Sequence, residues 1–350
     1  MNDSFAMYRL PHADCCQVIR QQEGRPREFH SYEQLAGLQG FVVAPFSISA
    51  NCPLVLIEGT RCEVQDTRYK IQGTRCEVRG MRYENTSASC PEDTAWPFRL
   101  FHEQLTTGRF RKIVLSRRFE TPVPAGFDAE ALFFRACALY PRMMIALVNT
   151  PQTGLWLTAT PEVLLEAAHD HYYTMALAGT QNLGSGLWDE HGVTWDEKNM
   201  MEQRYVATYI EQCLKPFADD IDEQGPYTQR AGHLAHLRSD FHFHLRDRQR
   251  LGQLLSALHP TPAVCGLPKQ DALDFILSHE PYRRRYYSGF LGPLDLSGET
   301  HLYVMLRCME QAGDRLWLYA GGGLLKDSQQ QKEWEETEAK LDTMRRLIWL

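Results

Sequence analysis

Two acidic residues and a lysine near the carboxyl end of the chain stand at the spacing of one helix face. Glu333, Glu336 and Lys340 are separated by three and four residues, which places them on a single ridge of a helix. In most proteins such a ridge is a solvent-exposed surface with an ion pair. The run that precedes it contains Gly321-Gly322-Gly323, where the backbone could approach a ligand closely. Carboxylates in this position could bind a hard cation such as Mg²⁺ if further acidic residues join them from distant segments.

Lys112 and Glu162 are charged residues within apolar segments. Lys112 precedes Ile113-Val114-Leu115, and Glu162 precedes Val163-Leu164-Leu165. Burial would lower the pKa of the lysine and raise that of the glutamate, which would make one a general base and the other a general acid. Each residue taken alone is more simply explained as a lysine whose amine reaches solvent or as an exposed glutamate. The acid–base interpretation therefore depends on their occurring together.

Other polar residues allow more than one interpretation. Lys198 and Glu202 stand four residues apart on a predicted helix, where a surface ion pair is the simplest explanation. His259 lies in a loop stiffened by two prolines, and Arg307, at a predicted strand end, could bind a carboxylate through two hydrogen bonds. A histidine- and arginine-rich stretch lacks cysteines at zinc-finger spacing, which argues against a zinc site. Because the chain is acidic overall, we expect the arginines of this stretch, Arg238, Arg246, Arg248 and Arg250, to lie on a solvated face rather than to bind RNA. Its histidines are His233, His236, His242 and His244.

The elements that must position these residues alternate between helical and strand patterns. Apolar periodicity predicts helices over 91–107, 129–139, 198–214, 251–258 and from 328 onward. Strands are predicted over 112–116, 144–148, 155–159, 303–307 and 315–320. Several connections have the length and residues of hairpin turns, which favours antiparallel pairing. The predicted fold class is therefore α+β.

The first 90 residues form a separate pattern, and we treat 91–350 as the catalytic region of the same fold. Strands are predicted at 41–46 and 54–57, and the segment Gly59 to Val64 recurs as Gly73 to Val78 with a shift of 14 residues. This tandem duplication over 59–86 has too few copies for a solenoid. Its alternating, charged pattern predicts a peripheral hairpin that extends from a sheet.

Composition excludes several classes of protein. The 350 residues include 37 basic and 44 acidic side chains, a formal net charge of −7, which argues against nucleic acid as the main partner. We find neither a secretory signal nor an apolar run long enough for a membrane span, and we expect a cytoplasmic protein. The ten cysteines are scattered without a C-x-x-C pair, so we expect reduced thiols.

With these segments in order, the chain resembles the chorismate-utilising enzymes, and among them the isochorismate synthases. The resemblance rests on Lys112 to Arg117, Thr160-Pro161-Glu162, Leu177-Ala178-Gly179-Thr180, Glu197-Lys198 with Glu202, Leu258 to Val264, Arg283 with Tyr287-Ser288-Gly289, Arg307, Ala320 to Gly323, and Glu333 to Thr337 with Lys340. It covers roughly residues 95–350. It implies two large, mainly antiparallel sheets packed together with helices outside.

The resemblance also implies a role for each matching residue. Lys112 would be the general base that activates water, and Glu162 the general acid. The metal Mg²⁺ would be bound by Glu202, Glu336 and, directly or through water, Glu333. Residues implied to line the chorismate site are Gly179, Thr180, His259, Tyr287, Arg307, Gly321 and Lys340. Arg307 and Tyr287 would contact the enolpyruvyl carboxylate.

Two positions indicate which branch of the family fits best. Relatives that use ammonia tend to have glutamine at the position of Lys112, so water is favoured and no glutaminase subunit is expected. Ala178 stands where aminodeoxychorismate synthases have a nucleophilic lysine. Salicylate synthases share both residues and stay an alternative, as does a catalytically silent chorismate-binding protein, although all the catalytic residue types are present. Isochorismate would feed menaquinone or siderophore synthesis. Gln181, Asn199 and Gln203 depart from the family pattern.

Overall fold

Two nine-stranded antiparallel sheets form the frame of the protein in the computed structural model, which describes residues 4–64, 96–182, 193–231, 234–295 and 297–349. The first sheet has the order β14 (Gly266–Leu267), β7 (Lys112–Pro122), β18 (Arg315–Leu324), β17 (Cys308–Ala312), β9 (Gly154–Thr160), β8 (Met144–Thr150), β1 (Phe5–Arg9), β2 (Cys16–Arg20) and β6 (Arg61–Val64). The second has the order β12 (Ala218–Ala231), β13 (Leu234–Leu245), β11 (His171–Asn182), β10 (Val163–Ala168), β16 (Glu299–Val304), β15 (Phe290–Leu294), β4 (Gly40–Ala44), β5 (Leu54–Ile57) and β3 (Arg27–Phe29). The predicted α+β fold of two antiparallel sheets is confirmed.

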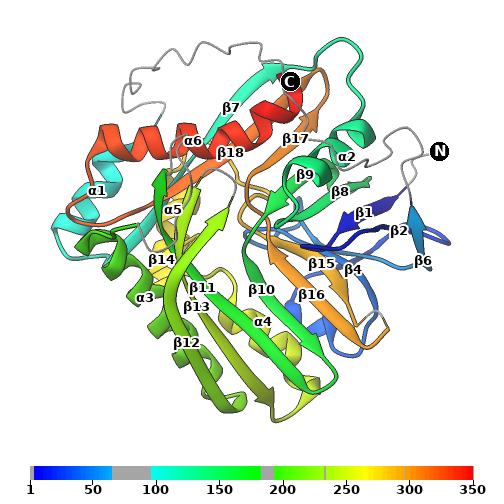
Figure 1. Cartoon of the computed structure of the whole chain (residues 1–350), viewed down its shortest axis with the longest axis horizontal. Coiled ribbons are helices and arrows are strands. Elements are labelled where there is room, and N and C mark those ends of the chain that lie inside the picture. Colours follow the sequence, from blue (N-terminus) through cyan, green and yellow to red (C-terminus); the bar gives the residue numbers. More distant parts are fainter. Residues whose placement is uncertain (1–3, 65–95, 183–192, 232–233, 296, 350) are drawn as a thin grey trace.

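Helices cover the outer faces of both sheets (Figure 1). The α-helices are α1 (Phe98–Thr106), α2 (Ala129–Leu139), α3 (Glu197–Leu214), α4 (Leu251–Leu258), α5 (Lys269–His279) and α6 (Gln330–Trp349), with 3₁₀ turns η1 (Tyr32–Leu35) and η3 (Arg248–Arg250). Helices α2 and α6 pack on the first sheet, and α3 and α4 pack on the second. Within the described residues, no helix is long and apolar enough to cross a membrane.

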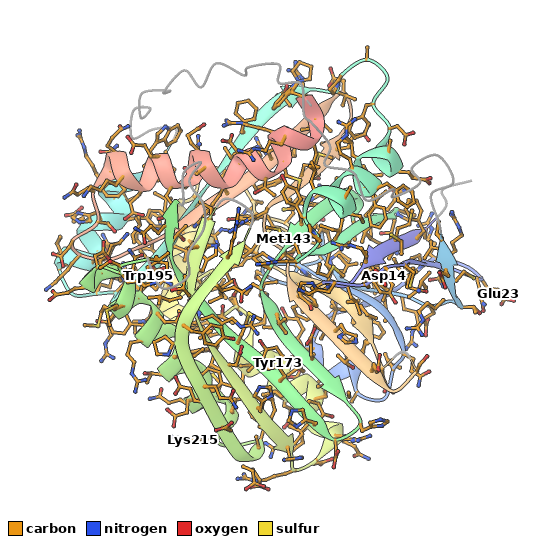
Figure 2. All side chains as sticks on the ribbon, viewed as in Figure 1. Asp14, Glu23, Met143, Tyr173, Trp195 and Lys215 are labelled. Carbon is orange, nitrogen blue, oxygen red and sulfur yellow. The ribbon has the colours of Figure 1, made fainter. Side chains whose placement is uncertain are left out.

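The central core lies between the two sheets. Side chains from β1, β8 and β9 of the first sheet meet side chains from β4, β5 and β16 of the second in one buried apolar cluster. Fully buried Trp156 and Tyr8 are among its largest members. Figure 2 shows side chains filling the space between the layers. Burial of this apolar surface is the main force that fixes the two sheets against each other.

The N-terminal residues belong to both sheets. Strands β1, β2 and β6 extend the first sheet beyond β8, and β3, β4 and β5 extend the second beyond β15. The start of the duplicated segment, β6, pairs with β2 at the edge of the first sheet. The predicted hairpin of the duplication falls mainly on residues 65–86, which lie outside the described residues.

The ends of two strands and the start of one helix differ from the prediction. The strand predicted over 315–320 continues as β18 to Leu324, so Gly321-Gly322-Gly323 are ladder residues opposite Ser116, Leu115 and Val114 of β7. Pairing with a neighbouring strand overrides the low strand propensity of glycine. The predicted strand over 303–307 ends at Val304, because Arg307 has a left-handed φ of 46°. Helix α1 begins only at Phe98, directly after Pro97, and residues 91–95 lie outside the described residues.

Candidate active site

A cavity between the two sheets and helices α3 and α6 brings together most of the predicted site residues. It is partly open to solvent, and the empty space in it, open solvent included, is about 630 Å³. Its lining includes Glu162, Gly179, Thr180, Glu202, Tyr287, Arg307, Gly321 and Lys340. A second, more open pocket of about 1380 Å³ shares Thr180 with it and is lined by Lys198, Glu333 and Glu336. The sequence therefore predicted residues that converge from both sheets and from two helices.

Lys112 lies beneath the cavity at the first position of β7 and is fully buried. Its Nζ is 2.9 Å from Oε1 of Glu202, which projects from α3. Burial would raise the pKa of Glu202, but the ammonium groups of Lys112 and Lys198 outweigh burial and lower it below its ordinary value. A Cβ atom on Gly323 would lie 2.3 Å from Glu202 Oε1 and 2.7 Å from Lys112 Cε. Position 323 of β18 therefore has to be glycine, because this ion pair lies directly against the backbone there.

Glu162 faces the same cavity from the bend between β9 and β10. Its backbone nitrogen donates to Thr160 Oγ1 at 3.3 Å, and its carbonyl accepts a hydrogen bond from the Val304 nitrogen at 2.9 Å. Burial raises the pKa of its carboxyl group to about 8, although Lys112, Lys340 and Arg307 oppose the shift. At neutral pH most Glu162 side chains are therefore protonated, as the sequence analysis expected of a buried glutamate.

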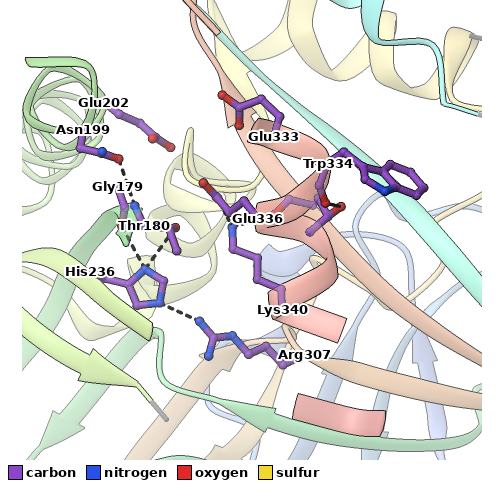
Figure 3. A network of polar contacts seen from close by, with 12 residues as sticks. Gly179, Thr180, Asn199, Glu202, His236, Arg307, Glu333, Trp334, Glu336 and Lys340 are labelled. Atoms are coloured by element: carbon purple, nitrogen blue, oxygen red, sulfur yellow. Dashed lines mark hydrogen bonds and ion pairs between the residues drawn. The ribbon is translucent and has the colours of Figure 1, made fainter. Parts of the chain in front are cut away.

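The carboxylates of Glu202, Glu333 and Glu336, called the carboxylate cluster below, face one space from α3 and α6 (Figure 3). Each is paired with a different lysine. Lys198 Nζ is 2.5 Å from Glu333 Oε1, and Lys340 Nζ is 2.7 Å from Glu336 Oε1. Burial and the neighbouring Glu336 raise the pKa of Glu333 against the opposing charge of Lys198. Among the described residues, no three acidic, histidine or cysteine side chains have the geometry of a formed metal site.

The cluster nevertheless has the composition of a site for a hard cation. A Cβ atom on Gly322 would lie 3.4 Å from Glu333 Oε2 and 3.7 Å from Glu336 Oε1, so the glycine leaves the two carboxylates room over β18. Glu333 Oε2 is buried and has no hydrogen-bond partner among the described residues. An unpaired buried carboxylate oxygen is costly, and oxygen ligands of this kind are those that Mg²⁺ prefers. The residues present therefore fit such a metal.

Arg307 is held in the cavity by a hydrogen-bond network that includes a histidine (Figure 3). Its Nη2 donates to His236 Nε2 at 2.7 Å, and His236 Nδ1 lies 3.0 Å from the carbonyl oxygen of Gly179. Because Arg307 donates to Nε2, the ring proton is assigned to Nδ1 and is donated to Gly179. Burial lowers the pKa of Arg307 to about 10, so the guanidinium keeps its charge at neutral pH.

His236 is buried and lines the cavity, a role that the sequence did not indicate. Arg246 and Arg248 of the same stretch are exposed, as predicted, whereas Arg238 and Arg250 are partly buried. His236 is the cross-strand partner of Thr180, which places it directly beside the predicted Gly179-Thr180 segment. Alternate residues of β13, among them Leu237, Phe241 and Phe243, are buried apolar side chains. This period-two pattern could have indicated a strand and placed His236 on the opposite face.

His259 lies away from the cavity lining. Its ring contacts Tyr32 and Phe290 edge-on, next to the apolar cluster between the second sheet and helices α3 and α4. Its Nε2 is 3.3 Å from the carbonyl oxygen of Pro45. Burial and the charge of Lys269 lower the pKa of His259 to about 3, so the imidazole is neutral. The structure thus places this predicted substrate residue in the packing behind the site. Tyr287 does line the cavity, with its ring stacked on Tyr319 at 5.3 Å between centroids.

A buried ion pair that the sequence analysis missed connects three segments of the site wall. Glu280 and Arg284 are at most 2% exposed and 2.5 Å apart. Arg284 also donates to the carbonyl oxygens of Val264 and Val114, at 2.7 and 2.9 Å, and both valines line the cavity. Glu280 Oε1 accepts hydrogen bonds from the backbone nitrogen and hydroxyl of Ser116 on β7. This network fixes β7 against the segment that carries Tyr287.

The three departures from the family pattern have different structural consequences. Asn199 Oδ1 accepts a hydrogen bond from the Thr180 nitrogen at 3.1 Å, which fixes the bulge at Gly179. Gln203 is buried and donates to the carbonyl oxygen of Ala176 at 3.0 Å, so it fastens α3 to β11 outside the cavity. Gln181 is exposed. The first two therefore stabilise the strand that carries Gly179 and Thr180.

Known proteins with similar sequences are named isochorismate synthases. The salicylate biosynthesis isochorismate synthase of Pseudomonas aeruginosa is 34% identical over 268 residues, which cover 75% of this chain and 56% of that protein. Isochorismate synthase EntC of Escherichia coli K12 is 29% identical over 243 residues, 68% of this chain and 62% of that protein. The chain therefore spans little more than half of the length of these relatives.

The fold is also similar to solved structures. MenF, the menaquinone-specific isochorismate synthase of Escherichia coli, has a TM-score of 0.77 at 22% identity and covers 99% of this chain and 88% of its own. Anthranilate synthase component I from Streptococcus pneumoniae has a TM-score of 0.60 at 21% identity, over 70% of this chain and 55% of its own. At these identities the likeness concerns the fold. The family model for chorismate binding enzymes matches residues 84–349, and the chain belongs to this family.

Proposed function

We propose that this protein converts chorismate to isochorismate by adding water at C2 while the C4 hydroxyl departs. The observation that carries the proposal is Glu162, which lines the cavity with a pKa of about 8, so that it holds a proton at neutral pH. A departing hydroxyl needs such a proton donor, and the incoming water needs a base at the other end of the allylic system. Lys112, buried beside the same cavity, is our candidate for that base, a role that requires its amine to be neutral and so to have given up its ion pair with Glu202. The names of the similar curated proteins support the same reaction.

Charges in the cavity suit a substrate with two carboxylates. The Arg307 guanidinium and the Lys340 ammonium both line it, and an arginine can bind a carboxylate with two parallel hydrogen bonds. We assign Arg307 and Tyr287 to the enolpyruvyl carboxylate, with His236 orienting the guanidinium through its 2.7 Å contact. Placing positive charge locally allows a protein with a net charge of −7 to bind a dianion.

The proposal includes Mg²⁺ as the cofactor, held by Glu202 and Glu336 with Glu333 beside them. Two features support this assignment: Glu333 Oε2 has no hydrogen-bond partner in the part of the chain that the structure describes, and Gly322 leaves room beside the two carboxylates. When bound, the metal would supply positive charge for the ring carboxylate of chorismate. Titration of Mg²⁺ should raise the melting temperature, and Glu202→Gln or Glu336→Gln should weaken that rise and abolish most turnover. Turnover that persists after chelation would reject the metal assignment.

The same site disfavours the amine-using reactions of the family. Lys112 occupies the position at which we expect the ammonia-using enzymes to have glutamine, and Ala178 lines the cavity without a nucleophilic group. Salicylate formation with loss of pyruvate stays the second candidate, since salicylate synthases resemble this chain at both positions. The Escherichia coli relative MenF, whose solved structure is described as menaquinone-specific, and a relative named vibriobactin-specific suggest either pathway as the destination of the product. A cytoplasmic location and the absence of a glutaminase subunit belong to this proposal.

One incubation separates the candidate reactions. The purified full-length chain is incubated with chorismate and Mg²⁺, without an amine donor, and the products are separated by chromatography while pyruvate is measured in parallel. We expect isochorismate without stoichiometric pyruvate. Salicylate and pyruvate in equal amounts would assign a salicylate synthase, and anthranilate formed after ammonium is added would reject both readings. Binding of chorismate without turnover would assign a silent binding protein. The Glu162→Gln variant serves as the matched control for uncatalysed decay.

A further inference from the structure

Lys198 has a position that the proposed reaction does not explain. It lies in the first turn of α3, four residues before Glu202, and its ammonium group contacts Glu333 of α6 at 2.5 Å. The contact joins two helices from segments 135 residues apart. The Lys198 side chain is 24% exposed, whereas that of Glu333 is 3% exposed. Lys198 thus lines the second, more open pocket, called the outer pocket below, while its ammonium group contacts a buried carboxylate.

Lys198 faces the whole carboxylate cluster and not Glu333 alone. Glu333, Glu202 and Glu336 all favour its charged form through space, and burial opposes them. Lys112 and Lys340, in contrast, form their close contacts at Glu202 and Glu336. Lys198 therefore interacts with all three carboxylates and contacts Glu333 directly, which is the position that a metal bound by the cluster would share. Two cations that compete for the same carboxylate repel each other strongly at close range.

The outer pocket contains other acidic side chains with which the Lys198 ammonium group could form an ion pair. The pocket of about 1380 Å³ that Lys198 lines also contains Asp196, Asp327 and Glu335. These acidic side chains could accept the ammonium group after it leaves Glu333, and lysine has a long, flexible chain with which to make this movement. A carboxylate as buried as Glu333 is unfavourable without a cation. A lysine that can leave would neutralise it only while no metal is present.

We propose that the Lys198 ammonium occupies the cation position of the carboxylate cluster in the metal-free protein and that Mg²⁺ has to displace it. Lys198 then limits the affinity of the protein for Mg²⁺. When the metal is absent, the charge of Lys198 reduces the repulsion among the three carboxylates of the cluster. This inference rests on the proposed Mg²⁺ site.

The test measures Mg²⁺ binding directly, by calorimetric titration of the metal-free full-length chain. Lys198→Met should bind Mg²⁺ about tenfold more tightly than the parent, because the competing charge is removed. Lys332→Met is the matched control, since Lys332 is an exposed lysine of the same pocket that forms no ion pair with the described residues. It removes one positive charge without removing the competitor, so its affinity should stay within about twofold of the parent. Lys198→Arg keeps the charge and should not gain affinity.

Melting temperatures give a second readout. Without metal, Lys198→Met should melt below the parent, because Glu333 loses its cation, and saturating Mg²⁺ should raise its melting temperature by more than it raises the parent's. If the methionine variant does not fold without metal, Lys198→Gln replaces it with the same expectations.

The possible outcomes separate this inference from the proposal on which it rests. Mg²⁺ binding by the parent, combined with unchanged or weaker binding by the Lys198→Met and Lys198→Gln variants, overturns the inference alone and makes Lys198 a support of the bound metal. An equal gain in affinity from Lys332→Met also overturns it, since general electrostatics would then explain the effect. If neither the parent nor any variant binds Mg²⁺, the metal site fails and the inference fails with it.

Discussion

Replacing Glu162 with glutamine should stabilise the protein at alkaline pH while it removes activity. Glutamine keeps the shape of the protonated side chain and cannot ionise. In the folded protein, burial raises the pKa of Glu162 from 4.5 to about 8. Between these values the folded state holds a proton that the unfolded state has lost, so the parent loses stability as pH rises. The slope is about 1.4 kcal/mol per pH unit, and over the full interval the loss is about 5 kcal/mol.

The assay is denaturant unfolding of the parent and of Glu162→Gln over a series of pH values, both with a metal chelator present. Near pH 4.5 the two proteins should differ little, and the advantage of the variant should grow through neutrality until it levels off above about pH 8. Turnover by the variant should fall by about 10²-fold or more, and kcat/KM of the parent should decline as pH rises through about 8. A stability difference that is flat with pH, or that shrinks as pH rises, would refute a buried, protonated Glu162.

Three further substitutions test other parts of the site. Lys112→Ala should lower kcat by about 10²-fold or more, and near-normal turnover would reject its role as base. In denaturant unfolding without metal, the same variant should be less stable than the parent, because Glu202 loses its partner. His236→Ala should raise KM for chorismate by about tenfold, because Arg307 loses its contact, and an unchanged KM in steady-state kinetics would contradict this. Glu280→Gln should cost about 3–5 kcal/mol in unfolding free energy, because it breaks a buried ion pair; a loss below about 1 kcal/mol would contradict it.

Local patterns predicted much of the fold and of the site. The helix over 129–139 and the hairpin of β8 and β9 were predicted because their signals lie within a few residues: apolar periodicity, and turn residues between two apolar runs. Lys112 and Glu162 stood out because each interrupts an apolar segment, and both proved buried. Such features need no knowledge of distant partners.

The residues that sequence reasoning missed depend on distant partners. His236 acquires its place from Arg307, 71 residues away, and Glu280 from Ser116, 164 residues away. The neighbours of Glu280 in the sequence do not distinguish it from an exposed polar side chain, and the alternation around His236 indicates a strand but not its contact with Arg307. The glycines of β18 lie beyond the strand predicted over 315–320 for the same reason, because only the ladder with β7 makes them a strand. Pairing between distant segments decides these positions, and local propensity does not.

The charges around the cavity imply that metal and substrate bind cooperatively. In the metal-free protein the three carboxylates of the cluster face three lysines and Arg307, with Glu162 protonated, so the site has only a small positive excess. A dianionic substrate that enters this site must compete with Glu336 for Lys340. Bound Mg²⁺ would add two positive charges and occupy the carboxylates, which frees Lys340 to face the substrate. Mg²⁺ should therefore lower the Kd of chorismate, and linkage requires chorismate to lower the Kd of Mg²⁺ by the same factor.

Calorimetric titrations of the slow Glu162→Gln variant, made in both orders, measure the two factors. If Mg²⁺ leaves the Kd of chorismate unchanged, the substrate does not contact the metal-bound cluster, and the lysine pairs serve only to stabilise the buried glutamates.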